Sequence, residues 1–264
     1  MSTEEREPSP TVTSNNLRHI GKKSFAFIPS EDTTMDLLKS CIAESVAYFL
    51  LVICIFFSEG DATKFIYGFW CILMVFGNIS GAHINPILTF SLWIYNGDLF
   101  IKKNLLKLGF YLLFQFIGAM LGTIFCWLVY SKAISYVTTP PYANIGSIFF
   151  VESFFSGTLA FMVLFICSPT TRPTEKNYVN VTLFSLWFML IIQSGNSISG
   201  ASYNPTFYLV LNGFARIFGK VEMAYSYLWI YILAPFIGAF IFTLLFKFIF
   251  KPFYASRNNK PVME

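Results

Sequence analysis

The chain has 264 residues, of which 55% are hydrophobic and only 12% are charged, whereas soluble domains carry about 25% charged residues. This composition excludes a soluble globular protein and indicates a polytopic membrane protein that occupies a lipid bilayer. The net charge of +4 does not indicate a nucleic-acid-binding protein, because the basic residues are scattered at the ends of apolar runs and form no patch.

The first stretch, residues 1–34, is polar and rich in Ser, Thr, Glu, Pro and Asn, which is typical of a disordered tail. Apolar runs of the length needed to cross a bilayer follow it. We expect six membrane-spanning helices near residues 35–57, 65–79, 105–130, 145–167, 178–192 and 225–250. A second tail, residues 252–264, follows the last helix.

One short stretch occurs twice. Residues 80–86 read Ser-Gly-Ala-His-Ile-Asn-Pro, and residues 199–205 read Ser-Gly-Ala-Ser-Tyr-Asn-Pro. Each copy ends a long apolar run and opens a shorter one, at 87–94 and 207–210. Because Asn suits the cap of a helix and Pro its first position, each copy predicts the start of a half-helix. Paired interrupted segments in two halves of a membrane protein indicate a transport site between inverted repeats.

Two further repeated sequence elements support an internal duplication. Glu44, in the sequence Ala-Glu-Ser, returns as Glu152 in Val-Glu-Ser, and the Phe-Ile-Gly-Ala sequence at 116–119 returns at 236–239. The small residues in these segments would let helices approach closely. We therefore expect one channel domain at 35–251, with repeat 1 at about 35–130 and repeat 2 at about 145–251.

The positive charges predict the orientation of the chain. Fourteen of the 18 Lys and Arg fall in the tails and in the loops predicted on the same side of the bundle as the tails. Because Lys and Arg accumulate on the cytoplasmic side of membrane proteins, both termini should be cytoplasmic. The sequence does not indicate which membrane holds the protein.

The chain shows no pattern typical of a catalytic or metal site. His19 and His83 are its two histidines, and the acids deep in the predicted spans are the lone Glu44 and Glu152. The five Cys lie in or beside apolar runs without C-x-x-C spacing, as expected for small buried side chains. We expect no enzyme activity, no metal and no cofactor. An ion-coupled transporter stays an alternative, although it normally needs paired charges or an ion site near the midplane.

The two Ser-Gly-Ala…Asn-Pro stretches, the paired Glu residues and the Gln115-x-x-Gly118-Ala119 sequence resemble the aquaporin, or major intrinsic protein, family over nearly all of residues 35–250. The resemblance implies an all-α membrane protein in which six helices and two re-entrant half-helices enclose a pore. It also implies a homotetramer and passive passage of water or small uncharged solutes. Asn85 and Asn204 would donate hydrogen bonds to passing water, and the half-helix dipoles would oppose protons and cations.

The resemblance implies roles for three further residues. Glu44 and Glu152 would accept hydrogen bonds from the backbone of the two turns, although acids within a membrane also serve in proton relays. His83 lies in the first turn, where a bracing contact and a pH-sensitive gate are both open. Tyr48, where the family often has Thr, and Tyr203 are unusual, and the sequence assigns neither of them a role.

Both turns depart from the Asn-Pro-Ala sequence that is common in the family. The two triplets predicted at the pore centre are Asn85-Pro86-Ile87 and Asn204-Pro205-Thr206. Ile87 would add apolar bulk beside the centre of the pore. The hydroxyl of Thr206 would bond back to its own helix or face the passage.

The predicted selectivity filter is also atypical. Phe207 stands where the family usually has an Arg, and the spacing from the two Asn residues places Phe65, Ile192 and Ala201 at the other filter positions. None of these four side chains donates a hydrogen bond. A water molecule that loses a hydrogen bond on entering such a filter, without a replacement, pays on the order of 1–3 kcal/mol. Such a filter favours weak water conduction, gating by dewetting, or a pore wide enough for glycerol or urea. A protein that has kept the fold and lost conduction is the alternative.

Overall fold

The computed structural model describes residues 33–97, 102–130, 137–139, 144–219 and 227–258, and the regular structure within these ranges is helical. The predicted tail at 1–34 lies almost entirely outside the described residues. In chain order the helices are α2 (Thr34–Ser58), α3 (Ala62–Phe76), α4 (Pro86–Asn96), α5 (Lys102–Val129), α6 (Ile145–Cys167), α7 (Asn177–Ser199), α8 (Pro205–Phe218), α9 (Leu228–Leu245), the π-helical turn η2 (Phe246–Phe250) and α10 (Lys251–Arg257).

Six of these segments correspond to the predicted spans. Five are long and apolar enough to cross a bilayer: α2, α5, α6, α7 and the continuous helix formed by α9, η2 and α10. The sixth, α3, is apolar but has only 15 residues. It begins after Asp61, whose carboxylate caps the backbone N–H groups of Thr63 and Lys64, and it ends at Phe76, four residues before the first duplicated stretch.

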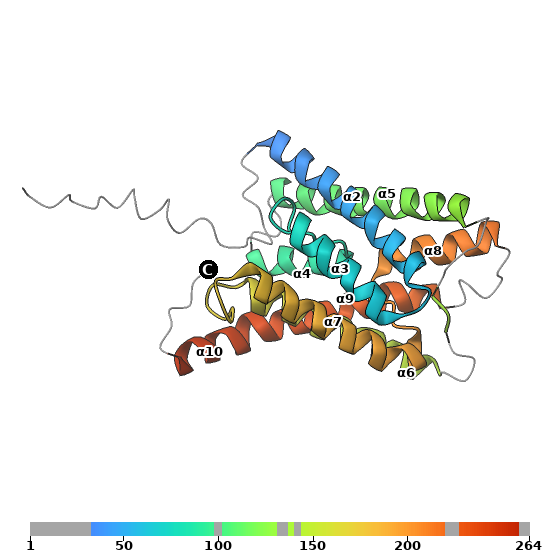
Figure 1. Cartoon of the computed structure of the whole chain (residues 1–264). Helices are drawn as coiled ribbons and strands as arrows, with labels where there is room; N and C mark the ends of the chain where they lie inside the picture. The colour runs from blue at the N-terminus through green and yellow to red at the C-terminus, as the bar shows by residue number, and fades with distance from the viewer. Residues whose placement is uncertain (1–32, 98–101, 131–136, 140–143, 220–226, 259–264) are drawn as a thin grey trace, which may run out of the picture.

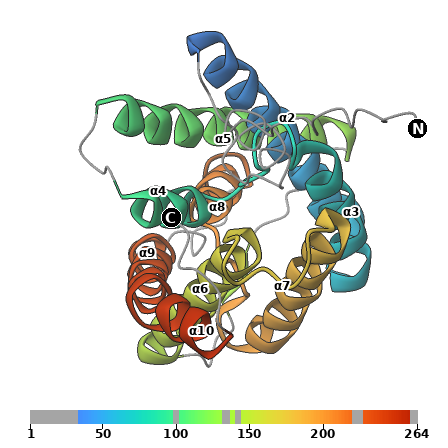
Figure 2. The ribbon, with the colours of Figure 1, turned by 90° about the vertical axis from the view of Figure 1, so that its left-hand side faces the viewer.

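The long helices surround a central region, and the two short helices lie within the bundle (Figures 1 and 2). Both α4 and α8 start near the middle of the bundle and run toward opposite faces, as Figure 1 shows. Helix α4 packs against α5, α6 and α9, whereas α8 packs against α5 and α9. The start of α2 and the end of α10 lie at the same face (Figure 1).

Two glycines at matching places in the repeats bring helices into close contact. A Cβ atom at Gly118 on α5 would collide with the backbone of Ser45 on α2. A Cβ atom at Gly238 on α9 would likewise collide with the backbone of Ser153 on α6. Each serine directly follows the repeated Glu, so these close contacts fix the helices that carry Glu44 and Glu152.

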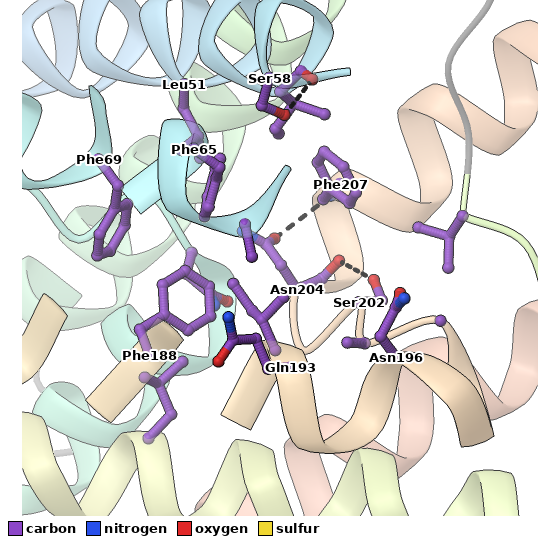
Figure 3. A pocket seen from close by; sticks show the side chains of 18 of the residues that line it. Leu51, Ser58, Phe65, Phe69, Phe188, Gln193, Asn196, Ser202, Asn204 and Phe207 are labelled. Carbon is purple, nitrogen blue, oxygen red and sulfur yellow. Dashed lines mark hydrogen bonds between the residues drawn. The ribbon is translucent and has the colours of Figure 1, made fainter. Parts of the chain in front are cut away.

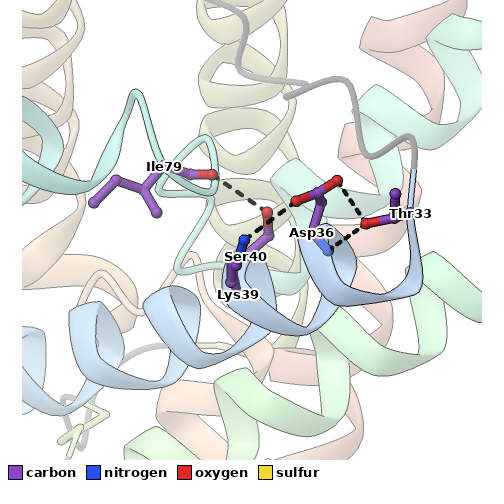
Figure 4. A network of polar contacts seen from close by, with 5 residues as sticks. All are labelled: Thr33, Asp36, Lys39, Ser40 and Ile79. Carbon is purple, nitrogen blue, oxygen red and sulfur yellow. Dashed lines mark hydrogen bonds and ion pairs between the residues drawn. The ribbon is translucent and has the colours of Figure 1, made fainter.

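The start of α2 is tied to the first duplicated turn (Figure 4). Thr33 caps the helix by accepting a hydrogen bond from the Asp36 backbone N–H at 3.1 Å, and Asp36 lies 3.5 Å from the Lys39 ammonium. The Ser40 hydroxyl donates to the carbonyl oxygen of Ile79 at 3.3 Å (Figure 4). Ile79 immediately precedes the duplicated stretch, so this contact holds the entry of the turn against α2.

Three helices extend beyond their predicted ends. The α7 helix continues to Ser199 rather than ending at Ile192, because its polar last turns line a cavity and need no apolar surface. The α8 helix continues past Val210 to Phe218, although the polar Asn212 breaks the apolar run. The last helix reaches Arg257, so the first residues of the predicted C-terminal tail are helical.

The hydrogen bonds of the Asn212 side chain explain why α8 tolerates this polar residue. Its side chain is fully buried, its Oδ1 accepts from the Val137 backbone N–H, and its Nδ2 donates to the Val137 carbonyl oxygen, each at 3.0 Å. The amide therefore holds Val137 against α8 and pairs both backbone polar groups of that residue.

Candidate functional site

The two duplicated turns share an unusual backbone. Residues at matching places in both turns have positive φ: Gly81 92°, Ala82 45° and Ile84 38° in the first, and Gly200 79°, Ala201 51° and Tyr203 46° in the second. The left-handed region costs a non-glycine residue roughly 1–2 kcal/mol. Such a backbone persists only when its surroundings hold it, and its N–H groups cannot bond within a helix.

Glu44 supplies the partners of the first turn. One carboxylate oxygen accepts from the Ser80 hydroxyl at 2.7 Å and the His83 backbone N–H at 2.8 Å. The other accepts from the Ile84 backbone N–H and from Gln115 Nε2, both at 2.8 Å. The side chain is fully buried, and these four donors offset the free-energy cost of removing the carboxylate from water.

Glu152 does the same for the second turn. Its carboxylate accepts from the Ser199 hydroxyl at 2.7 Å, the Ser202 backbone N–H at 3.1 Å and the Tyr203 backbone N–H at 2.9 Å. It is also fully buried. The two acids therefore make matching contacts in the two halves, and each one satisfies the backbone N–H groups that the strained turns leave over.

Asn85 and Asn204 cap the half-helices that follow the turns. The Asn85 side-chain oxygen accepts from the Ile87 backbone N–H at 3.1 Å, and that of Asn204 accepts from the Phe207 backbone N–H at 3.3 Å. A proline occupies the first position of each half-helix, as the sequence predicts. The amides thus lie at the positive ends of the α4 and α8 dipoles.

Each asparagine also reaches the opposite turn. Asn85 Nδ2 donates to the Tyr203 carbonyl oxygen at 2.9 Å, and Asn204 Nδ2 donates to the Ile84 carbonyl oxygen at 3.0 Å. Tyr203 and Ile84 directly precede Asn204 and Asn85 in the sequence. These reciprocal bonds join residues about 120 positions apart and hold the tips of the two half-helices against each other.

A cavity of about 650 Å³ opens beside this junction. Asn85 and Asn204 both line it, together with residues of α2, α3 and α7 (Figure 3). The four residues predicted for the filter also lie on its wall: Phe65, Ile192, Ala201 and Phe207. The fold therefore brings together on one cavity side chains that the sequence separates by up to 142 positions.

One wall of the cavity is aromatic. The rings of Phe65, Phe69 and Phe188 contact one another at centroid distances of 4.8–6.0 Å, and Phe184 lies 6.2 Å from Phe69. Figure 3 shows Phe65, Phe69 and Phe188 together, with Phe207 nearer the mouth. The wall is formed by α3 and α7, and sequence reasoning identified only Phe65 in it. Repetition of Phe at intervals of four residues, at 65 and 69 and at 184 and 188, is the signal that would have found the others.

The mouth of the cavity is polar. Ser58, Asp61, Gln193 and Asn196 lie there, and both carboxamides are exposed on the last turns of α7. The backbone N–H groups of Thr63 and Lys64 lower the pKa of the Asp61 carboxyl, so it stays ionised at neutral pH. The sequence did not identify Gln193 and Asn196 because the predicted helix stopped at Ile192, nor Ser58 and Asp61, which follow the first predicted span.

The remaining predicted positions lie behind the lining. Ile87 and Thr206 are buried in the first turns of α4 and α8. His83 is 3% exposed, its Nδ1 lies 3.2 Å from the Thr89 hydroxyl, and its ring centroid lies 5.0 Å from that of Tyr111. His83 is thus packed within the protein beside the first turn.

Tyr203 locks the second turn in place. Its hydroxyl donates to the Ile191 carbonyl oxygen at 3.1 Å, and its ring packs edge-on against Phe155 at 5.6 Å. Gly195 on α7 provides the space, because a Cβ atom there would collide with the Tyr203 hydroxyl. Tyr203, to which the sequence assigns no role, therefore fixes its own backbone, whose carbonyl oxygen accepts the hydrogen bond from Asn85 Nδ2.

Comparison with known proteins agrees with this architecture. A model of the family described as "Major intrinsic protein" matches residues 31–246. The chain belongs to the major intrinsic protein family. Its six apolar helices make it a multi-pass integral membrane protein, and the predicted all-α fold with two half-helices in inverted repeats is confirmed.

Relatives within the major intrinsic proteins are distant. The chain is 31% identical over 178 residues to "Probable aquaporin NIP7-1" of Arabidopsis thaliana, which covers 66% of this chain and 58% of that protein. It is 27% identical over 194 residues to "Aquaglyceroporin-2" of Rhizophagus irregularis, covering 64% of this chain and 59% of that protein. The matches thus span about three-fifths of the length of these two relatives.

A solved structure of another family member has the same fold. The aquaglyceroporin from Plasmodium falciparum superposes with a TM-score of 0.70 over 83% of this chain and 99% of that chain, at 20% sequence identity. At this identity the likeness establishes the fold of this major intrinsic protein and leaves its permeant solute to be determined.

Proposed function

We propose that this protein is a passive transmembrane channel for water or small uncharged solutes, with Asn85 and Asn204 at the centre of the passage. The observation that carries the proposal is that both amides lie on one cavity and bond across the junction of the half-helices. The membership of the family and the names of its relatives agree with a channel.

The amides suit a passage rather than a tight binding site. Each Nδ2 carries two N–H groups, and one of them is used for the bond to the opposite turn. The second N–H can donate to the oxygen of a passing solute. Two neutral donors at the positive ends of two half-helices orient an oxygen without a strong attraction, and conduction requires weak binding of this kind.

The lining favours neutral solutes. The aromatic wall and the predicted filter residues Phe65, Ile192, Ala201 and Phe207 offer an ion no partner to replace its hydration, which makes entry of an ion costly. Of the described residues that line the cavity, Asp61 is the one with a charged side chain, and it lies at the mouth. An ion-coupled transporter would need charged or ion-binding groups at the midplane, so this alternative is disfavoured.

We also propose the assembly and orientation that the sequence predicts. The chain would form a homotetramer in a lipid bilayer, with both termini cytoplasmic, and it would act without a cofactor, a metal or nucleic acid and without enzymatic activity. Cross-linking of purified protein should give a band at four times the mass of 30.1 kDa. Protease protection of tags placed at both termini would test the orientation.

The test of transport is solute flux in vesicles. Purified protein in lipid vesicles should shorten the shrinkage time in a sucrose gradient, or the swelling time in a glycerol or urea gradient, relative to empty vesicles. Ile192→Trp, which places a large ring on the cavity wall, should abolish that acceleration. The matched control is Leu190→Trp on the same helix, since Leu190 is 52% exposed and does not line the cavity.

The outcomes separate the candidate functions. Flux that is lost in the Ile192 variant and kept in the Leu190 variant supports a channel through this cavity. Flux that is equal in both variants places the passage elsewhere. If no water or solute flux exceeds that of empty vesicles, the protein has kept the fold without conduction, as its apolar filter also allows.

A further inference from the structure

The two central asparagines are held differently. In the part of the chain that the structure describes, the side-chain oxygen of Asn85 accepts one hydrogen bond, from the Ile87 backbone N–H of its own half-helix. The oxygen of Asn204 accepts from the Phe207 backbone N–H at 3.3 Å and also from the Tyr48 hydroxyl at 2.9 Å. Asn204 is therefore held by a residue from the other half of the chain, 156 positions away.

Tyr48 makes this contact from behind the cavity wall. It is fully buried on α2, one turn after Glu44, and it does not belong to the cavity lining. Leu51 and Ile55, further along the same face of α2, do line the cavity. The phenol can therefore influence a solute only through the Asn204 amide that it touches.

The second repeat has no equivalent contact. Ser156 follows Glu152 by four residues, as Tyr48 follows Glu44, and it is also fully buried. Its hydroxyl has no hydrogen-bond partner among the described residues. The short serine at this position leaves Asn85 with the bond from its own helix, so the support of the amide is built into one repeat only.

Both ends of the Asn204 amide are thereby fixed. Tyr48 and Phe207 hold the oxygen, and the Ile84 carbonyl holds one N–H of the nitrogen. A side-chain torsion held at both ends keeps the second N–H in one direction. We propose that Tyr48 is a positioning residue that holds the Asn204 amide with its free N–H toward the passage, an inference that rests on the channel function proposed above.

The test begins with Tyr48→Phe, which removes the hydroxyl and keeps the ring that fills the site. Loss of one buried neutral hydrogen bond shifts an equilibrium by about two- to tenfold, so water or solute flux should fall by about that factor. Ser156→Ala, at the corresponding place in the other repeat, should leave the flux unchanged. If Tyr48→Phe conducts as well as the unchanged protein, the inference is wrong.

A second measurement does not depend on conduction. Solid-state NMR of protein labelled with ¹⁵N-asparagine in bilayers follows the side-chain nitrogen of Asn204, which is assigned by its loss in Asn204→Asp. Tyr48→Phe should broaden or split this resonance, whereas Ser156→Ala should not. An unaltered resonance overturns the inference even if the protein conducts nothing, and absence of flux in the unchanged protein contradicts only the proposed function.

Discussion

The close contact between Gly195 and Tyr203 predicts that a larger residue at position 195 destabilises the protein. In Gly195→Ala the new methyl group collides with the Tyr203 hydroxyl, lies 3.0 Å from the adjoining ring carbon and 3.2 Å from a methyl carbon of Val151. Tyr203 is fully buried, so its ring cannot move into solvent. Overpacking costs about 1–3 kcal/mol. Loss of the bond to the Ile191 carbonyl adds about 1 kcal/mol, for a total of about 2–4 kcal/mol.

A double-mutant cycle tests this assignment. Tyr203→Phe alone should destabilise by about 1 kcal/mol through the lost hydrogen bond. In the double variant the methyl group meets a ring carbon instead of the hydroxyl, so its destabilisation should be at least about 1 kcal/mol smaller than the sum of the single changes. The assay is thermal unfolding of purified protein in detergent.

The control is Gly109→Ala on α5, where a Cβ atom would meet nothing within 4 Å. Removing a glycine from the interior of a helix stabilises by about 0.5–1 kcal/mol, so this variant should be at least as stable as the unchanged protein. Strictly additive effects of the Gly195 and Tyr203 changes would refute the packing described here.

Two further predictions concern the brace and the filter. Whichever way the new amide turns, Glu152→Gln places an NH₂ group against the backbone N–H of either Ser202 or Tyr203. This variant should lower the unfolding free energy by about 1.5–3 kcal/mol. The control is Glu59→Gln, which should change the unfolding free energy little because Glu59 is exposed. Phe207→Arg adds a donor to the cavity wall and recovers about 1 kcal/mol or more of solute desolvation. Water flux through this variant should therefore rise about fivefold or more and the ratio of water to glycerol flux should change, and an unaltered ratio would place Phe207 outside the filter.

The sequence predicted the parts of the site that depend on local chemistry. Asn suits the cap of a helix and Pro its first position, and the pattern occurs twice before an apolar run, so the first residues of α4 and α8 were predictable. Duplication added the pairing of Glu44 with Glu152. Spacing from Asn85 and Asn204 was sufficient to identify four residues that do lie on one cavity, although their role as a filter stays a prediction.

What the sequence missed depends on the surroundings that the fold creates. Gln193 and Asn196 indicated the end of a membrane span because they are polar, yet a helix that lines a polar cavity mouth needs no apolar surface there. Asn212 broke the apolar run of α8, yet its amide makes two hydrogen bonds to the Val137 backbone. The bond from Tyr48 to Asn204 joins positions 156 residues apart and has no local signal.

The two repeats match where they hold the backbone of the turns, and they differ at buried positions behind the cavity lining. The carboxylates of Glu44 and Glu152 bond to matching groups, and Gly118 and Gly238 bring matching helices together, because both strained turns need the same support. The matching positions Tyr48 and Ser156, and Ile87 and Thr206, are buried and differ in size or polarity. Support of the turns is thus common to both halves, whereas the properties of the passage depend on single residues of one half. Substitutions at the shared positions should therefore act mainly on stability, whereas loss of the Tyr48 hydroxyl should act on flux.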